Sequence, residues 1–161
     1  MAKPPRPTAG PPASFDPRNV SGPDGRTHSY RVQGFTVIEL RGEIDLYTAD
    51  HAGTPLETAC ARPGLRILVD LRPVDFFDAS ALSLLCRARR RALAHGGYLG
   101  LICAHPWHLR ILHIAGLSEA LCPQPTVEQG IAAALLHLQT ETACDRDGAS
   151  VTVTGQAGTG S

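Results

Sequence analysis

The stretch LRILVDLRPVDFFDASAL, residues 65–82, decides the fold. Residues 65–71 are almost all hydrophobic, which is typical of a central strand that is covered on both faces. From residue 79 to 95, apolar residues recur at helical spacing instead. They are Leu82, Leu85, Cys86, Ala88, Ala92 and Leu93. A buried strand, a loop at 72–75 and an amphipathic helix together predict an α/β unit.

Further strands are expected on both sides of this unit. The β-branched and apolar runs at 30–33 and 35–41 flank Gly34, and their close spacing predicts a hairpin. Residues 42–45 are expected to leave the sheet, and residues 98–103 form another buried strand. Because helical segments separate the later strands, the pattern predicts a mixed sheet with crossover connections.

Three more helices are predicted, over about 48–61, 106–114 and 127–138. Thr48 or Asp50 is the expected cap of the first helix, in which Pro55 fits only if it lies in the first turn. Thr126 is the expected N-cap of the last helix. The apolar stripe of that helix is Ile131, Leu135 and Leu138.

The chain therefore predicts a single α/β domain, a small mixed β-sheet flanked by about four helices, over residues 28–140. Residues 1–27 hold seven of the thirteen prolines and are expected to form a disordered leader rich in Pro and Gly. Residues 141–161 are expected to be a flexible tail.

Composition restricts the function. Fifteen basic and fifteen acidic residues balance, so the sequence indicates no overall field for nucleic acid or a membrane surface. No apolar run reaches the roughly 20 residues that span a bilayer. Five widely spaced cysteines without a CxxC pair favour free thiols in a reducing compartment. We expect a cytoplasmic protein that makes no direct contact with nucleic acid or membrane.

The segment around Ser80 is the main candidate site. Asp78 is placed to cap the helix, which puts Ser80 in the first turn near the surface. Free amides and the positive helix end would tolerate a phosphate there, while Asp75 and Asp78 would make the surface strongly anionic. A partner that docks on the uncharged surface would then be repelled. The same residues also fit a purely structural capping pair.

Other chemistry has weaker support. The chain contains no dinucleotide-binding glycine motif, phosphate-binding loop, zinc-protease motif or nucleophile elbow. His105, His108 and His113 lack metal-ligand spacing and are interpreted as structural or surface histidines. The basic run at residues 87–91 is interpreted as a solvated helix face. We therefore expect no enzyme, no cofactor and no metal; a small α/β enzyme or a thiol or metal protein is the least favoured alternative.

Three blocks of the sequence resemble the anti-sigma factor antagonists of bacteria, which are single STAS domains. Residues 40–49, LRGEIDLYTA, are similar to the family's L-x-G-E-L-D-x-x-T-A block. Residues 68–82 are similar to its V-x-D-L-x-x-V-x-F-x-D-S-S-G-L block. Residues 114–117 are similar to the x-x-G-L that follows the third helix. The blocks occur in the right order across about 110 residues, the whole predicted domain.

The resemblance implies a regulator of transcription that acts by partner switching. Such proteins bind an anti-sigma factor, often itself a serine kinase, and free a sigma factor. The kinase inactivates the antagonist by phosphorylating the serine that matches Ser80, and a serine phosphatase restores it. Asp45 and Asp78 match the family's acidic residues near that serine. The expected partner-binding residues are Asp45, Thr48, Asp75, Phe77, Asp78, Ser80, Leu82 and Ser83.

Two residues depart from the family pattern. Ala79 replaces the first serine, which is not the modified one, so little change is expected. Ala81 replaces the glycine after the phosphosite, and a methyl group there is expected to crowd an approaching kinase loop. The alternative function is a STAS protein-interaction module of another assembly, such as a signalling scaffold or a lipid-transport complex, that is not phosphorylated.

Overall fold

The computed structural model describes residues 25–148, with side chains to residue 142. The strands are β1 (Thr27–Val32), β2 (Phe35–Leu40), β3 (Gly42–Ile44), β4 (Arg66–Asp70), β5 (Val74–Phe77) and β6 (Tyr98–Ile102). The helices are α1 (Ala49–Cys60), α2 (Ala79–Ala94), α3 (Pro106–Ile114), α4 (Ser118–Leu121) and α5 (Val127–Gly148). The predicted mixed α/β fold is confirmed, with five helices among the described residues instead of about four.

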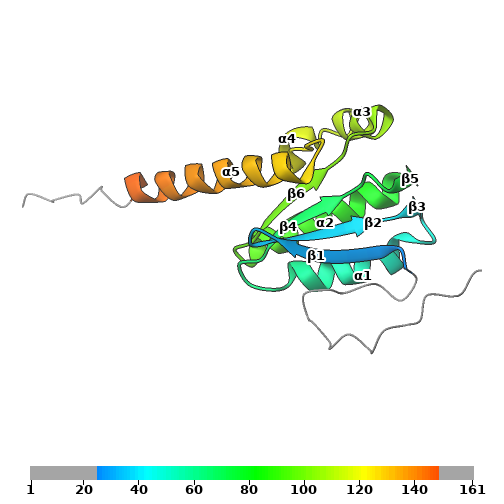
Figure 1. Ribbon diagram of the computed structural model, residues 1–161, viewed down its shortest axis with the longest axis horizontal. Helices are drawn as coiled ribbons and strands as arrows, with labels where there is room; N and C mark the ends of the chain where they lie inside the picture. Colours follow the sequence, from blue (N-terminus) through cyan, green and yellow to red (C-terminus); the bar gives the residue numbers. More distant parts are fainter. Residues whose placement is uncertain (1–24, 149–161) are drawn as a thin grey trace, which may run out of the picture.

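The main sheet has the order β1-β2-β4-β6 (Figure 1). β1 and β2 are antiparallel and form the predicted hairpin, although β1 begins at Thr27, earlier than expected. Gln33 and Gly34 both have positive φ, as a two-residue hairpin turn requires. β2, β4 and β6 run parallel. β4 is central, as its near-continuous hydrophobic sequence predicted.

Each face of the main sheet packs against its own helices. α1 and α2 cover one face with a core that includes Leu56, Leu84 and Leu85. The other face packs on α5, with Leu68 and Ile131 in the contact. Figure 1 shows α1 and α5 on opposite sides of the strands. The alternation of β4 side chains between the two cores fixes its register, because a shift by one residue would exchange the faces.

A second, two-stranded sheet was not predicted. Residues 42–44 do not simply leave the main sheet but form β3, which pairs in parallel with β5. β5 begins at Val74, inside the segment that was expected to be a loop. Both strands are shorter than five residues and their ladder has a register irregularity. We call this pair the β3–β5 ribbon; it leads directly into α2.

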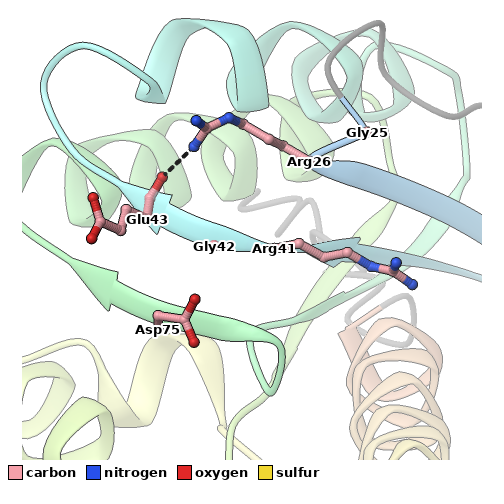
Figure 2. Close-up of a pocket in the computed structure, with 6 residues that line it drawn as sticks. All are labelled: Gly25, Arg26, Arg41, Gly42, Glu43 and Asp75. Carbon is pink, nitrogen blue, oxygen red and sulfur yellow. Dashed lines mark hydrogen bonds between the residues drawn. The ribbon is translucent and has the colours of Figure 1, made fainter.

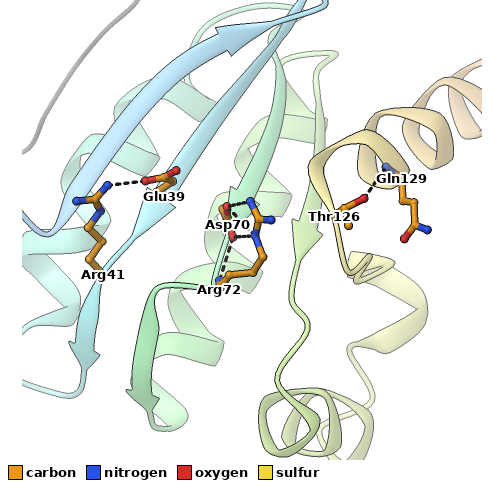
Figure 3. A network of polar contacts seen from close by, with 6 residues as sticks. All are labelled: Glu39, Arg41, Asp70, Arg72, Thr126 and Gln129. Atoms are coloured by element: carbon orange, nitrogen blue, oxygen red, sulfur yellow. Dashed lines mark hydrogen bonds and ion pairs between the residues drawn. The ribbon is translucent and has the colours of Figure 1, made fainter.

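An ion pair between a buried aspartate and an exposed arginine shapes the turn that leads into the ribbon. The Asp70 side chain is only 1% exposed, and its carboxylate accepts hydrogen bonds from the Arg72 guanidinium (2.7 Å from Nη2) and backbone N–H (2.9 Å) (Figure 3). The Leu71 carbonyl accepts from the Val74 amide at 3.0 Å. A buried carboxylate needs such partners to remain charged. The pair therefore fixes the chain direction between β4 and β5.

Several helix details differ from expectation. Pro55 lies inside α1 and not in its first turn. α5 continues to Gly148, past the predicted end at 138 and into the predicted tail. Its buried hydrophobic side chains are Val127, Ile131 and Ala134, so Leu135 lies off the apolar stripe. The predicted leader up to residue 24 and the tail from 149 lie outside the described residues.

Candidate functional site

The ribbon brings two predicted site segments together. Ile44 and Phe77, the last residues of β3 and β5, are partners in the ladder. The Asp78 amide also donates to the Ile44 carbonyl at 3.3 Å. Asp45 and Asp78 follow these two residues directly, so they leave the ribbon at the same end. The unpredicted sheet thus brings together two residues that are more than thirty positions apart in the sequence.

Asp78 caps α2, as predicted. Its backbone is extended, and its Oδ1 accepts a hydrogen bond from the Ser80 amide at 2.8 Å. This bond satisfies one of the free amides of the first turn. Ser80 is the second residue of the helix and is half-buried. Its hydroxyl-bearing position therefore lies at the positive end of the helix dipole, beside a carboxylate.

Asp45 and Thr48 close the loop that joins β3 to α1. Asp45 Oδ1 accepts from the Tyr47 amide, the Thr48 amide and the Thr48 hydroxyl, all at 3.0 Å. Thr48 Oγ1 accepts in turn from the Asp45 amide at 2.9 Å. Thr48 occupies the N-cap position but its side chain makes no cap bond to α1. The hydrogen bonds with Thr48 lower the pKa of Asp45, which keeps this loop anionic.

This loop and β5 expose large apolar side chains. Leu46 is 70% exposed, Tyr47 is 83% exposed and Phe76 is 50% exposed. None of the three was predicted as a site residue. Their signal in the sequence is an apolar pair, Leu46-Tyr47, directly after a turn-forming aspartate. We call the set Asp45, Leu46, Tyr47, Phe76, Asp78 and Ser80 the Ser80 surface.

The remaining predicted contact residues divide into two groups. Asp75 and Ser83 are exposed beside the Ser80 surface. Phe77 is only 2% exposed and packs in the core, so its predicted contact with a partner stays a prediction that its burial does not favour. Leu82 is partly buried against the same core. In the short strand β5 it is Phe76, not Phe77, that points outward.

Ala81 does not present its side chain to solvent. It is 4% exposed and belongs to the core between α2 and the sheet. The expected crowding of an approaching kinase loop by its methyl group is therefore wrong, because that methyl group faces inward. The replacement of glycine by alanine in the first turn also favours the helix, by about 1 kcal/mol in general.

An open pocket of about 390 Å³ lies beside the ribbon. Its lining residues are Gly25, Arg26, Arg41, Gly42, Glu43 and Asp75 (Figure 2). Arg26 Nη1 donates to the Glu43 carbonyl at 3.0 Å, and Arg41 points the other way to pair with Glu39 at 2.8 Å. The Arg26 guanidinium thus links the start of β1 to β3, and the pocket is interpreted as part of the ribbon's support.

Two histidines of α3 pack behind the ribbon. His108 is 2% exposed, and its ring lies 4.6 Å from those of Phe77 and His105, measured between centroids. His108 Nδ1 has no hydrogen-bond partner, and its burial, with His105 nearby, lowers its pKa. His105 Nδ1 accepts from the Trp107 amide at 3.2 Å and caps α3. The buried ring of His108 thus fits the neutral state.

We predict that His108→Phe weakens the acid sensitivity of the fold. The folded-state pKa of His108 lies below its unfolded value of about 6.5, so its unfolded form binds a proton first. Its contribution to stability is full above that value and is lost as the pH falls through the folded pKa. Urea unfolding measured at pH 7.5 and at pH 5.0 should show a smaller loss of stability between the two pH values for the variant than for the wild type. An unchanged or larger loss contradicts this.

The buried cysteines do not favour thiol chemistry. Burial raises the pKa of Cys60 to about 12 and raises that of Cys103 as well. A thiol with a raised pKa is a poor nucleophile and a poor metal ligand at neutral pH. Within residues 25–148 no group of three or more potential metal ligands comes together, and no helix is long and apolar enough to cross a membrane.

Comparisons with known proteins agree with this architecture. The sequence matches the STAS domain family model over residues 27–133. The comparison with curated protein sequences gave no match. The resemblance stated from the three sequence blocks is therefore confirmed at the level of the family.

Solved structures also match a large part of the chain. One is an anti-sigma factor antagonist from Mycobacterium paratuberculosis, 25% identical, with a TM-score of 0.62 over 71% of this chain and 97% of that one. Another is a STAS domain protein from Planctomyces limnophilus, 21% identical, with a TM-score of 0.58 over 67% and 97%. A third is a sulfate transporter family protein from Wolinella succinogenes, 17% identical, with a TM-score of 0.56 over 74% of this chain and 97% of that one. The last two show the fold alone.

Proposed function

Because the chain belongs to the STAS domain family, we propose that it is an anti-sigma factor antagonist. In this proposal the Ser80 surface binds an anti-sigma factor and thereby frees a sigma factor for transcription. The likeness to the Mycobacterium paratuberculosis antagonist, which extends over 97% of that chain, supports the choice within the family. The exposed Leu46 and Tyr47, which follow Asp45 at the end of the ribbon from which α2 starts, are the structural observation that carries it.

The Ser80 surface has the composition of a binding interface. Aromatic side chains are enriched in interfaces, and those that become buried on binding often supply most of the affinity. Tyr47 and Phe76 are of this kind, and Leu46 adds an aliphatic contact. The bonds from Thr48 to Asp45 hold the loop in one conformation, which lowers the entropy lost on binding.

Phosphorylation of Ser80 is proposed as the control of this binding. A phosphate adds about 1.5 to 2 negative charges at neutral pH. The Asp78 carboxylate already accepts a hydrogen bond from the Ser80 amide, and Asp45 lies at the same end of the ribbon. The added charge would meet two carboxylates and repel a partner that fits the unmodified surface. A serine kinase partner would add the group, and a serine phosphatase would remove it.

Leu46→Ala is expected to weaken binding to the anti-sigma factor by about tenfold, since an exposed leucine would lose its buried contact in the complex. Leu136→Ala is the matched control, because Leu136 is 67% exposed on α5, on the other side of the main sheet. Isothermal titration calorimetry compares the two. Equal affinities for both variants would place the interface elsewhere.

The phosphorylation step is tested with the candidate kinase and ATP. Intact mass measurement should show one added phosphate on the wild type and on Ser83→Ala, but none on Ser80→Ala. Ser83 is the matched control because it is an exposed serine one turn further along α2. Ser80→Asp should bind the anti-sigma factor about tenfold more weakly than Ser80→Ala. Equal phosphate on wild type and Ser80→Ala would remove Ser80 as the site.

Affinity purification separates this proposal from the alternative module function. Recovery of an anti-sigma factor that is lost with Leu46→Ala supports the antagonist. Recovery of transporter or scaffold subunits without an anti-sigma factor would overturn it and favour a STAS module of another assembly. Either result leaves the assignment to the STAS family unchanged.

A further inference from the structure

A groove between α2 and α4 is a second candidate binding surface. It has a volume of about 270 Å³. Its apolar residues are Leu93, Leu117, Ala120 and Leu121, and its polar residues are Cys86, Arg89 and Arg90. Leu121 is 1% exposed and forms part of the floor, whereas Leu93 is 42% exposed at the side. The sequence predicts Leu93 on the buried stripe of α2, yet it lies on the open groove.

The charged side of this groove is uniformly positive. α2 carries four arginines, at positions 87, 89, 90 and 91, and no acidic residue between Ala79 and Ala94. Arg89 Nε donates to the Ala120 carbonyl at 2.9 Å, which fixes its guanidinium between the two helices. Arg87 turns to α1, where it pairs with Glu57 at 3.3 Å. Arg89 and Arg90 therefore line the groove with positive charge.

The groove is separate from the Ser80 surface. Both lie on α2, but Arg89 and Arg90 follow Ser80 by nine and ten residues, which is roughly 14 Å along a helix axis. An occupant of the groove therefore need not touch the first turn of α2. The inference below stands without the proposed function, because it rests on a different set of residues.

We propose that the α2–α4 groove binds an acidic segment of a protein partner through an aliphatic side chain. The aliphatic side chain covers Leu93 and rests on Leu117 and Leu121, which removes apolar surface from water. Carboxylates on either side of it pair with Arg89 and Arg90. Arginine is suited to this role because its guanidinium binds carboxylates in a fixed geometry.

The lining favours a protein segment over other anionic partners. Single-stranded nucleic acid is held by bases that stack on aromatic side chains, and none of the groove residues is aromatic. Membrane-surface helices present a long apolar face, whereas the groove is a hollow of about 270 Å³ with two arginines in its lining. The net charge of zero for the whole chain also limits attraction to the uniform charge of a nucleic acid or lipid surface.

Fluorescence anisotropy with labelled peptides tests this inference on the full chain. The probe is a short peptide of glutamates with interspersed leucines. One control replaces each leucine by serine, and the other replaces each glutamate by lysine. We expect the probe to bind about tenfold more tightly than either control and to weaken as salt is raised. Equal binding of a control, or no binding of the probe, overturns the proposal.

Two variants locate the binding. Arg90→Glu is expected to weaken binding of the probe by about tenfold. Arg31→Glu, which changes an exposed arginine on β1, is expected to leave the binding unchanged. In the wild type the bound probe should also slow alkylation of Cys86, which lines the groove. Tighter binding of a single-stranded oligonucleotide or of phosphatidylglycerol vesicles than of the peptide, or a full effect of Arg31→Glu, would overturn the proposal.

Discussion

Leu84→Ala is expected to lower the free energy of unfolding by about 3 kcal/mol, because Leu84 is fully buried between α1 and α2. The two helices approach closely at this residue. A Cβ added at Gly53 of α1 would lie 2.8 Å from Leu84 Cδ1. This contact also fixes the relative position of α1 and α2, whose N-cap residues are Thr48 and Asp78.

A double-mutant cycle with Gly53→Ala makes the prediction sharper. Alone, Gly53→Ala overpacks the contact by about 1–2 kcal/mol and regains about 1 kcal/mol of helix propensity. Once Leu84 is truncated, the added methyl group has space and only the gain remains. We therefore expect the double variant to be more stable than the sum of the single variants predicts, by the relieved overpacking of about 1–2 kcal/mol. Urea denaturation followed by circular dichroism measures each corner, and simple additivity would contradict the close contact.

Gly97→Ala is expected to destabilise the domain by about 2–3 kcal/mol for a steric reason. Its added Cβ would lie 2.5 Å from the Leu65 carbonyl oxygen, a backbone atom that cannot rotate away. That carbonyl also accepts the Tyr98 amide at 3.1 Å, so a shift would disturb the start of β6.

The neighbouring Gly96→Ala variant is the matched control. Gly96 has a φ of +69° and open space around its Cβ, so its substitution costs only the left-handed backbone conformation, about 1 kcal/mol. Thermal and urea unfolding of both variants should give the larger loss at position 97. The reverse order would mean that the turn between α2 and β6 has room for a side chain.

The elements that the sequence predicted well are those with long periodic patterns. The strand at 65–71, the helix at 79–95 and the helix at 106–114 each span enough residues for alternation or helical spacing to be decisive. The cap at Asp78 followed from local chemistry and is confirmed by its bond to the Ser80 amide. The family resemblance supplied the role of that pair, which the local pattern left as a capping pair or a phosphosite.

The misses have physical causes. β3 and β5 are three and four residues long and pair only with each other, which is too short for a strand pattern to emerge. The buried face of α2 includes Ala81 and Leu84, whereas spacing counted from Leu82 selected Leu93. A small residue such as alanine gives little hydrophobic signal even where tight packing requires it. β5 is likewise too short for its sequence to show that Phe76 is exposed and Phe77 is buried.

The ribbon of β3 and β5 and the main sheet are expected to differ in local stability. Its two short strands pair only with each other, through bonds such as Gly42 N to the Pro73 carbonyl at 3.2 Å, and it shares no ladder with the main sheet. Local opening of two short strands requires less free energy than global unfolding. Amide hydrogens in the ribbon should then exchange long before those of β4. In the proposed function the partner would meet this ribbon, while the main sheet keeps its structure.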